Sequence, residues 1–397
     1  MIIKKENINF ILITILIFVA FFDAHLEKIF QIDRLPLAEL LLMPLALFST
    51  IINILNNKKS NHIFILIFTT ILLTIISGMI NLNKPVVIIL GVIWLYKSML
   101  AFYIGTQYKF SLEKYQQLIK WIYRLSVFSA FITILQLVVR INPLGFYIHR
   151  SYHVGIMDNP NKNAFIMLFG LLFSQYYKTK YNKIIAILFV FGIVLTQSRQ
   201  ILLLLIVVFL YYFIFIKKYY LYASMFFIAT LGFIVKFKDV FFKRLSEIDR
   251  IMSGEYFRVK AIKISFQAIN DNPFFGLGPG SFGGAIANIF NSPYHDKYML
   301  FEHWKHYKNA NIVPGTIDMF WPHMMVEVGV ISLIINILIY YLIFKNLKKN
   351  KLFFPLMIYI VIFFMSFFSM AFEATYLSIP IFIILGINYN RKTINAD

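Results

Sequence analysis

The stretch FGIVLTQSRQILLLLIVVFL, residues 191–210, consists of two apolar runs joined by a short polar segment. That segment contains Arg199, and a charged side chain at the centre of a bilayer is costly. Near a membrane surface the cost is smaller, because a long side chain can reach water. The stretch therefore predicts two short membrane helices that meet at a polar turn near the surface, or one long bent helix.

The composition of the whole chain agrees with a membrane protein. Of its 397 residues, 60% are hydrophobic, 18% are aromatic and only 14% are charged, which is more apolar surface than a soluble domain buries. The net charge of +20 lies between the apolar runs and forms no stripe, so we expect anionic lipid as a partner and no nucleic acid. Cysteine is absent, which excludes disulfides, thiol nucleophiles and thiolate metal sites.

Apolar segments of roughly membrane-spanning length recur along the chain. They predict an all-α, polytopic membrane protein with about 12 transmembrane helices. The first is expected to be an uncleaved span, because no small-x-small cleavage site follows it. The predicted spans are 8–22, 36–55, 62–80, 85–105, 119–139, 161–177, 183–198, 200–216, 219–235, 321–344, 352–371 and 375–389.

The connections between these segments predict the topology. Lys and Arg are concentrated in alternate connections, and this bias places both termini in the cytoplasm and Arg199 at the outer face. We expect three regions: helices 1–9 in 1–235, a long extracytoplasmic loop in 236–320, and helices 10–12 in 321–397. A connection of this length in a compact bundle is usually functional.

The long loop contains two ordered patterns. Apolar residues at helical spacing between Arg250 and Asn270 predict an amphipathic helix that lies along or dips into the membrane surface. The following stretch, Asn272–Ser281, is rich in Gly and Pro. We interpret it as a shaped elbow in which Gly276, Gly278 and Gly280 let the backbone approach a substrate; a purely structural turn is the alternative.

Two arginines are candidate anion-binding residues. The guanidinium group of Arg199 suits phosphate, and Thr196 and Ser198 place hydroxyl groups nearby. Arg258 lies on the predicted loop helix before the elbow. The alternatives are an interfacial Arg199 that reaches toward water and an Arg258 on a solvated face.

His323 is the candidate base. It follows Pro322 at the start of the tenth span, where the helix dipole favours a neutral imidazole. An interfacial histidine bonded to the backbone is the alternative. Glu327, four residues on, shares its face and has three possible roles: a second base, an orienting group for His323, or a buried structural acid.

Three further histidines are candidate metal ligands. His295, His303 and His306 have a spacing that zinc sites use, but loop histidines in solvent are the better reading, and no metal or other cofactor is expected. His149 and His153 lie in another outward loop. Near them, the Asp158-Asn159-Pro160-Asn161 motif makes Asn161 a candidate substrate-binding residue.

Taken together, these motifs resemble the O-antigen ligase and Wzy-type polysaccharide polymerase superfamily. The matching pieces stand in order: Thr196-Gln197-Ser198-Arg199, Arg258 followed by Asn272-Pro273-Phe274-Phe275-Gly276-Leu277-Gly278, and Pro322-His323 followed by Glu327-Val328-Gly329. The resemblance covers residues 158–335. Two positions depart from the family pattern: Met324 replaces an asparagine and Gln200 replaces a glycine.

The resemblance implies a metal-independent glycosyltransferase on the outer side of the bacterial cytoplasmic membrane. Its donor and acceptor would be oligosaccharides linked to undecaprenyl diphosphate, and a flippase and a chain-length regulator would be partners. Arg199 and Arg258 would bind the diphosphate, and His323 would remove or orient the acceptor hydroxyl proton. We expect a polymerase of capsule, O-antigen or exopolysaccharide; an O-antigen ligase or a protein oligosaccharyltransferase is the alternative within the superfamily.

A secondary transporter or flippase for polysaccharide precursors is the alternative from another class. It predicts paired broken helices in the two halves of the chain and ionisable residues at the bilayer midplane. Lys97 and Glu373 are the candidate deep ionisable residues. The two halves share no evident sequence pattern, which favours the enzyme.

Overall fold

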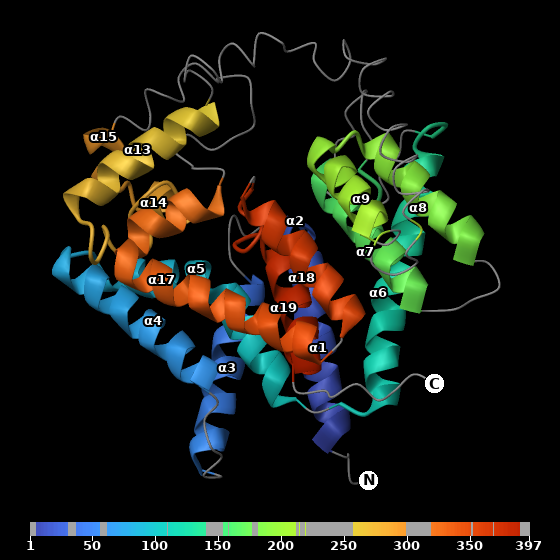
Figure 1. The fold of residues 1–397 in the computed structure, drawn as a ribbon, viewed down its shortest axis with the longest axis horizontal. Helices are drawn as coiled ribbons and strands as arrows, with labels where there is room; N and C mark the ends of the chain where they lie inside the picture. Colours follow the sequence, from blue (N-terminus) through green and yellow to red (C-terminus); the bar gives the residue numbers. More distant parts are fainter. Residues whose placement is uncertain are drawn as a thin grey trace. The chain divides into compact units, whose positions relative to one another are not determined.

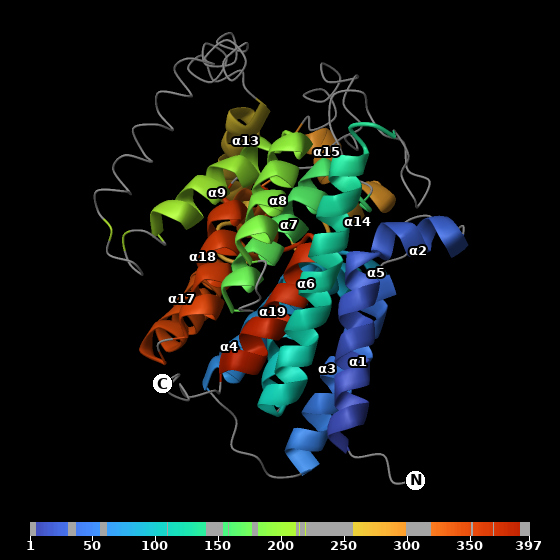
Figure 2. The ribbon, with the colours of Figure 1, turned by 90° about the vertical axis from the view of Figure 1, so that its right-hand side faces the viewer.

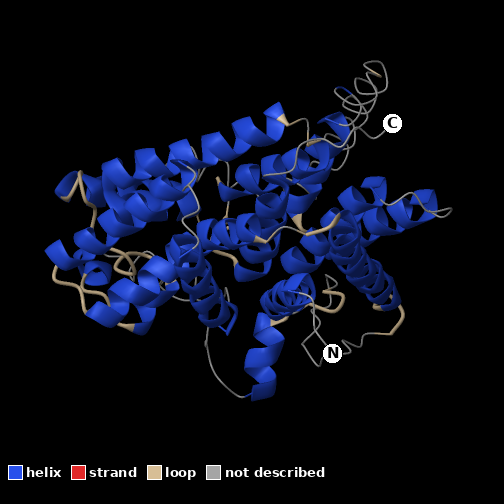
Figure 3. Ribbon diagram, turned by 90° about the horizontal axis from the view of Figure 1, so that it is seen from below, coloured by secondary structure: helices blue, strands red, loops and turns tan. Residues whose placement is uncertain are grey.

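A computed structural model describes residues 5–30, 37–55, 62–108, 110–139, 154–157, 159–176, 182–211, 214, 219, 257–298, 319–350, 352–367 and 369–389. This described part is built from helices and turns and has no strand (Figure 3). The predicted all-α class is therefore confirmed, and its apolar helices make the chain a polytopic membrane protein.

The helices are labelled in Figure 1. Those before the long loop are α1 (Lys5–Phe21), α2 (Asp23–Phe30), α3 (Leu37–Leu55), α4 (His62–Ile80), α5 (Pro85–Gln107), α6 (Leu112–Leu135), α7 (Pro160–Tyr176), α8 (Asn182–Thr196) and α9 (Arg199–Tyr211). The rest are α13 (Phe257–Asp271), α14 (Ala285–Ile289), α15 (Tyr294–Lys297), α17 (Phe320–Lys349), α18 (Phe353–Ser366) and α19 (Thr375–Tyr389).

Eleven of the twelve predicted spans coincide with a helix in the described part of the chain; the ninth, 219–235, lies almost wholly outside it. Among the described helices, α4, α5, α6 and α17 are each long and apolar enough to cross a membrane, and the other apolar helices are shorter. Residues 191–210 form the end of α8 and most of α9, and Gln197 between the two helices has a φ of 54°.

One compact unit consists of residues 1–35 and 109–246. In it α6, α7 and α8 pack side by side (Figure 2). A Cβ on Gly170 of α7 would lie 2.5 Å from side-chain atoms of Phe189 and Ser126, so glycine permits this close packing. Asn163 of α7 joins two helices, because its Oδ1 accepts from Ser129 Oγ at 2.5 Å.

A second compact unit consists of residues 36–108 and 247–397. Its helices α5 and α19 cross at two glycines. A Cβ on Gly105 would lie 2.3 Å from the Ile383 carbonyl oxygen, and one on Gly386 would lie 2.3 Å from that of Phe102. Small residues at such crossings are typical of membrane helix pairs, because association there depends on close backbone packing.

The loop helix is present as α13, although residues 250–256 lie outside the described part. Its apolar residues Ala261, Ile264 and Ala268 are buried in a cluster that includes Leu277 and Val326. This face therefore packs against the elbow and α17, and the expected position of the helix along the membrane surface stays a prediction. The sequence alone did not show which residues cover this face, because Leu277 and Val326 come from distant segments.

The helix α17 is interrupted at Gly329, which has a φ of 72° and a ψ of 175°. Only glycine adopts this combination readily. The interruption leaves backbone N–H and C=O groups without partners inside the helix, and inside a membrane protein such groups must be satisfied by other protein atoms. The segment before the break contains His323 and Glu327.

Candidate active site

The Gly/Pro elbow, Asn272–Ser281, supplies the partners that the break in α17 requires. Leu277 N donates to Val326 O at 2.9 Å and Gly278 N donates to Glu327 O at 3.0 Å. In the other direction, Val330 N donates to Pro273 O at 2.9 Å. The elbow and the broken helix are therefore complementary backbone segments, which fixes the elbow against α17.

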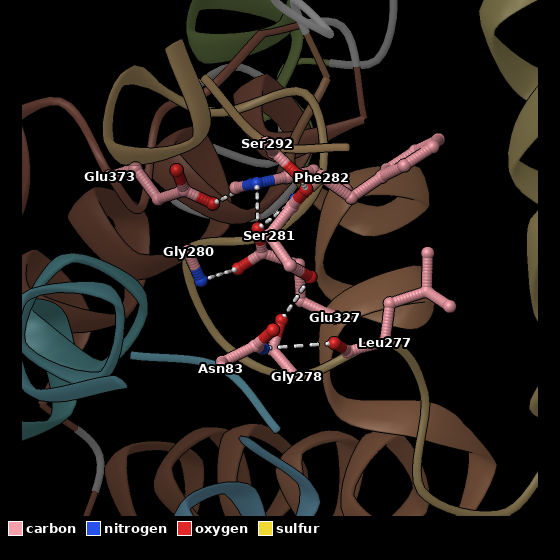
Figure 4. Close-up of polar contacts among 10 residues, drawn as sticks. Asn83, Leu277, Gly278, Gly280, Ser281, Phe282, Ser292, Glu327 and Glu373 are labelled. Carbon is pink, nitrogen blue, oxygen red and sulfur yellow. Dashed lines mark hydrogen bonds and ion pairs between the residues drawn. The ribbon is translucent and has the colours of Figure 1, made fainter. Parts of the chain in front are cut away.

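The other side of the elbow is held by the end of α4 and the turn after it. Ser77 Oγ donates to Phe275 O at 2.5 Å, Asn81 Nδ2 donates to Gly276 O at 3.0 Å, and Asn83 Nδ2 donates to Leu277 O at 3.1 Å. Figure 4 shows Asn83 reaching Leu277. Gly276, Gly278 and Gly280 all have positive φ, of 71°, 91° and 70°. The predicted elbow is thus a rigid, backbone-bonded turn.

Glu327 fastens the far end of the elbow. Its Oε2 accepts from Gly280 N and its Oε1 accepts from Phe282 N, each at 2.8 Å (Figure 4). The side chain is only 1% exposed. Hydrogen bonds to an ionised carboxylate are short and strong, and a buried carboxylate without them would be highly unfavourable. This geometry favours the structural role among the three that the sequence left open.

His323 lies between two carboxylates. Its Nδ1 is 2.8 Å from Glu373 Oε1, and its Nε2 is 3.2 Å from Glu327 Oε1 without the alignment of a hydrogen bond. All three side chains are 1–2% exposed. The contact with Glu327 follows from the i,i+4 spacing on α17, whereas Glu373 comes from the turn between α18 and α19.

The arrangement has a clear chemical consequence. When Nδ1 donates to Glu373, Nε2 is the ring nitrogen that can gain or release a proton. The two nearby carboxylates stabilise the imidazolium that then forms, in the manner of the carboxylate in a Ser-His-Asp triad. Met324, which stands in place of the family asparagine, is fully buried, and Glu373 provides the contact that orients the ring.

A small recess with almost no free volume lies beside this histidine. His323 and Glu327 line it together with Trp94, Gly280 and Gly284. Behind Trp94 lies a buried ion pair: Lys97 Nζ is 2.5 Å from Glu39 Oε1 and 3.6 Å from the centre of the Trp94 ring. Lys97 also donates to Thr375 Oγ1 at 2.9 Å, two residues after Glu373.

The motif around Arg199 is built differently. Ser198 O accepts from Leu202 N at 2.9 Å, so Ser198 caps α9 and Arg199 is the first residue of that helix. Ser198 Oγ donates to Asn161 Oδ1 at 2.6 Å, which joins the Asn-Pro-Asn motif to the turn. Thr196 is buried and its Oγ1 donates to Ile193 O at 2.7 Å. The side chain of Arg199 lies outside the described part.

The end of α13 and the α15 segment form a polar cluster at the edge of the elbow. Asp271 Oδ2 accepts from Tyr298 OH at 2.6 Å and lies 2.7 Å from Lys297 Nζ. Burial, together with the hydrogen bond to Asp271, raises the pKa of Tyr298 to about 12. Burial lowers the pKa of His295, so its neutral form is favoured.

No group of three His, Cys, Asp or Glu side chains suited to a metal ion occurs among the described residues. Of the loop histidines with zinc-like spacing, His295 is described, whereas His303 and His306 lie outside the described part, as do His149 and His153.

One comparison with known proteins bears on this site. The sequence model of a family described as O-antigen ligase matches residues 184–312. The resemblance to the O-antigen ligase and polymerase superfamily is confirmed. The O-antigen ligase match contains Arg199, Arg258 and the elbow, and it ends before His323. No curated protein matches the chain.

The predicted site residues fall into two groups. Asn161, Thr196 and Ser198 lie together in the first unit, with Arg199 at the same turn. His323 and Glu327 lie together with the elbow glycines in the second unit, which also contains Arg258 on α13. The side chain of Arg258 lies outside the described part. The union of both groups in one cavity stays a prediction.

Sequence reasoning did not assign three residues that border His323. Glu373, Trp94 and Gly284 all lie beside the imidazole or its recess. Glu373 had a usable signal, since an acid inside an apolar segment is a functional candidate by default. Trp94 and Gly284 had none, because an aromatic residue in an apolar helix and a glycine in a Gly-rich turn are ordinary.

Proposed function

We propose that the protein is a polymerase that joins oligosaccharide repeat units carried on undecaprenyl diphosphate into a surface polysaccharide. The observation that carries the proposal is the buried His323, which is oriented by Glu373 and whose Nε2 has no hydrogen-bond partner among the described residues. The O-antigen ligase match supports glycan transfer from lipid-linked oligosaccharides as the reaction class.

The proposed reaction is a single displacement. A hydroxyl oxygen of the acceptor sugar attacks the anomeric carbon of the donor, and a new glycosidic bond forms as the bond from that carbon to the phosphate oxygen breaks. The hydroxyl proton moves to His323 Nε2, and the electron pair of the broken bond leaves with the lipid diphosphate. Attack opposite the leaving group inverts the anomeric centre.

The diphosphate is already a good leaving group, and it is negatively charged. The protein therefore needs cations to bind it. We assign this role to Arg199 and Arg258, with Thr196, Ser198 and Asn161 as hydroxyl and amide contacts near the first of them. The elbow glycines would bring the backbone close to the donor. In this proposal no metal takes part, and the site faces the outer side of a bacterial cytoplasmic membrane, with both chain termini in the cytoplasm.

The arginine assignment is tested by substitution. Arg199→Ala and Arg258→Ala should each abolish polymer while the protein remains in the membrane at normal level, because each removes a diphosphate contact. Lys260→Ala, on the same helix as Arg258, is the matched control and should leave polymer unchanged. Normal polymer in the Arg258→Ala strain would remove that residue from the site.

A ligase is the second candidate, since the matching family carries that description. The length of surface glycan in a deletion strain separates the two. A polymerase predicts single repeat units on their normal anchor after deletion. A ligase predicts long chains that remain unattached to that anchor, and this result would overturn the polymerase.

A third experiment distinguishes the enzyme from a transporter of the precursors. Purified protein in proteoliposomes receives lipid-linked repeat units from a deletion strain, without any ion gradient. Consumption of these units with formation of longer glycans supports the enzyme. Movement of the units that needs a gradient and leaves their length unchanged would contradict it.

A further inference from the structure

We infer that a buried ion pair between Lys97 and Glu39 holds the proposed base in its working position. It acts through Thr375, which fixes the turn that presents Glu373 to His323. This inference rests on the proposed function and deepens it, because it adds positioning residues to the reaction. The segment that matches the O-antigen ligase family contains neither member of the ion pair.

The ion pair lies in the interior of the second unit. Lys97 is 0% exposed and Glu39 is 1% exposed, and Lys97 Nζ donates to Glu39 Oε1 at 2.5 Å. Ionisable residues inside membrane helices are costly and are functional candidates by default. A buried ion pair is also weak evidence for stability, since apolar residues of similar volume often stabilise as well or better. A role other than stability is therefore indicated.

Thr375 joins the ion pair to the start of α19. Its Oγ1 donates to Glu39 Oε1 at 2.5 Å and accepts from Lys97 Nζ at 2.9 Å. Hydrogen bonds to charged groups are shorter and stronger than those between neutral groups. Because Glu39 belongs to α3 and Lys97 to α5, the first residue of α19 is fixed to two other helices at one point.

The turn that contains Glu373 is held on both sides. On one side Phe372 is fully buried, and its ring stacks on Tyr340 at a centroid distance of 4.6 Å. Within the turn, Glu373 N donates to Met370 O at 2.9 Å. On the other side Thr375 follows two residues after Glu373. With so short a connection, a shift of Thr375 must also move the Glu373 carboxylate.

The contact that this turn supports is short. His323 Nδ1 is 2.8 Å from Glu373 Oε1, and both side chains are 1–2% exposed. A functional side chain keeps its geometry only when neighbouring groups hold it. A misplacement of about 1 Å, caused by a substitution far from the chemistry, can slow a reaction about 100-fold. Thr375 and the ion pair can therefore affect the reaction without touching a substrate.

The first test substitutes Thr375 and measures elongation of lipid-linked repeat units by purified protein. Thr375→Val keeps the shape but removes the hydroxyl group, and it should lower kcat about 10–100-fold with an unchanged KM. Thr375→Ser keeps the hydroxyl group and should restore most of the rate. A wild-type kcat in Thr375→Val would overturn the inference.

Ser378→Ala is the matched control for these variants. Ser378 lies on the same helix and is fully buried, and its Oγ has no hydrogen-bond partner among the described residues. Loss of this hydroxyl group should leave both kcat and KM unchanged. A loss of kcat equal to that of Thr375→Val would mean that any buried change in α19 slows the reaction, and it would contradict the specific role of Thr375.

A double variant shows whether Thr375 acts through Glu373. Glu373→Ala removes the carboxylate that is to be positioned, so the addition of Thr375→Val should lower kcat no further. If Thr375 supported the fold in general, the double variant would be slowed by the product of the two single effects. That result would overturn the inference.

The ion pair is tested by replacing both charges together. Glu39→Leu combined with Lys97→Met leaves no unpaired charge, so the thermal unfolding midpoint should stay near that of the wild type. Thr375 loses both of its charged partners, and kcat should fall as far as in Thr375→Val. A double variant that does not fold, or a folded one with wild-type kcat, would contradict the positioning role.

A spectroscopic measurement separates this inference from the proposed function. In protein with isotopically labelled histidine, the resonance of the His323 Nδ1 proton reports the hydrogen bond to Glu373. It should shift in Thr375→Val and stay unchanged in Ser378→Ala, whether or not the protein elongates glycan. An unchanged resonance in Thr375→Val would overturn the inference. A wild-type protein that elongates no glycan would refute the proposed function alone.

Discussion

Two regions of this protein interrupt a helix at a residue with positive φ, and they resolve the interruption differently. In the second unit α17 breaks at Gly329, and a loop from about fifty residues earlier supplies backbone partners for the break. In the first unit α8 and α9 are separated at Gln197, and the break is closed by nearby groups of Thr196 and Ser198. The break at Gly329 is closed by contacts between distant segments, and the break at Gln197 is mainly a local turn.

This difference explains why the more rigidly held groups lie in the second unit. The elbow is bonded to α4 and to both sides of the break in α17, and Glu327 ties its last part to the same helix that carries His323. The proposed base, His323, would benefit from such rigid support. The turn at Gln197 has one longer-range side-chain bond among those described above, from Ser198 to Asn161. We expect it to tolerate change better.

The largest effect on stability is expected at Glu327. Glu327→Ala leaves two buried N–H groups, of Gly280 and Phe282, without their acceptor. Loss of one partner from a buried charged contact typically destabilises by about 3–5 kcal/mol. Thermal unfolding in detergent measures the change, and Glu327→Gln, which retains one acceptor oxygen, should lie between the alanine variant and the wild type. An unaltered midpoint for Glu327→Ala would show that the elbow is held by other contacts.

Substitutions at the two breaks should change the free energy of unfolding by different amounts. Gly329→Ala places a Cβ 2.4 Å from Phe274 O and forces a residue with a side chain into a strained region, at a cost of about 1–3 kcal/mol for the strain alone. Gln197→Gly removes strain from a left-handed residue and should change stability by less than about 1 kcal/mol. Paired unfolding curves provide the comparison. Equal losses in both variants would contradict the distinction between an assembled and a local break.

A smaller loss of stability is expected when the Ser198–Asn161 hydrogen bond in the first unit is removed. Ser198→Ala removes the hydrogen bond to Asn161 and should destabilise by about 0.5–1.5 kcal/mol. Asn161→Ala should cost a similar amount, and the double variant should lose little more than either single one, since both report the same bond. Fully additive losses would mean that the two side chains act independently.

Much of the fold was accessible from sequence because the length of an apolar segment is a local signal. Helices at eleven of the predicted spans, the helix in the long loop and the turn at residues 196–199 all appear in the described part of the chain. The pairing of His323 with Glu327 followed from helical spacing. The partnership of His323 with Glu373 did not, because fifty residues separate them in the chain. The filling of the α17 break by the elbow and the burial of α13 likewise depend on contacts between distant segments.

The smallest predicted effect is a pH dependence near the elbow. Burial lowers the pKa of His295 below its ordinary value, so in the unfolded state this histidine binds a proton more readily than in the folded state. The α15 segment should therefore be fully stable above about pH 6.5 and lose stability as the pH falls below that value. Hydrogen exchange of residues 285–298, corrected for intrinsic rates, should be faster at acidic pH. His295→Asn should remove the difference.

The most direct test of the proposed activity is the turnover of purified protein with lipid-linked repeat units at saturating donor. His323→Ala should lower the rate by a factor of about 10²–10⁴, the usual contribution of a general base. Glu373→Gln, which keeps an acceptor for Nδ1 but removes its charge, should show an intermediate loss with normal donor KM. A His323→Ala protein that folds normally and elongates glycan at the wild-type rate would contradict the account.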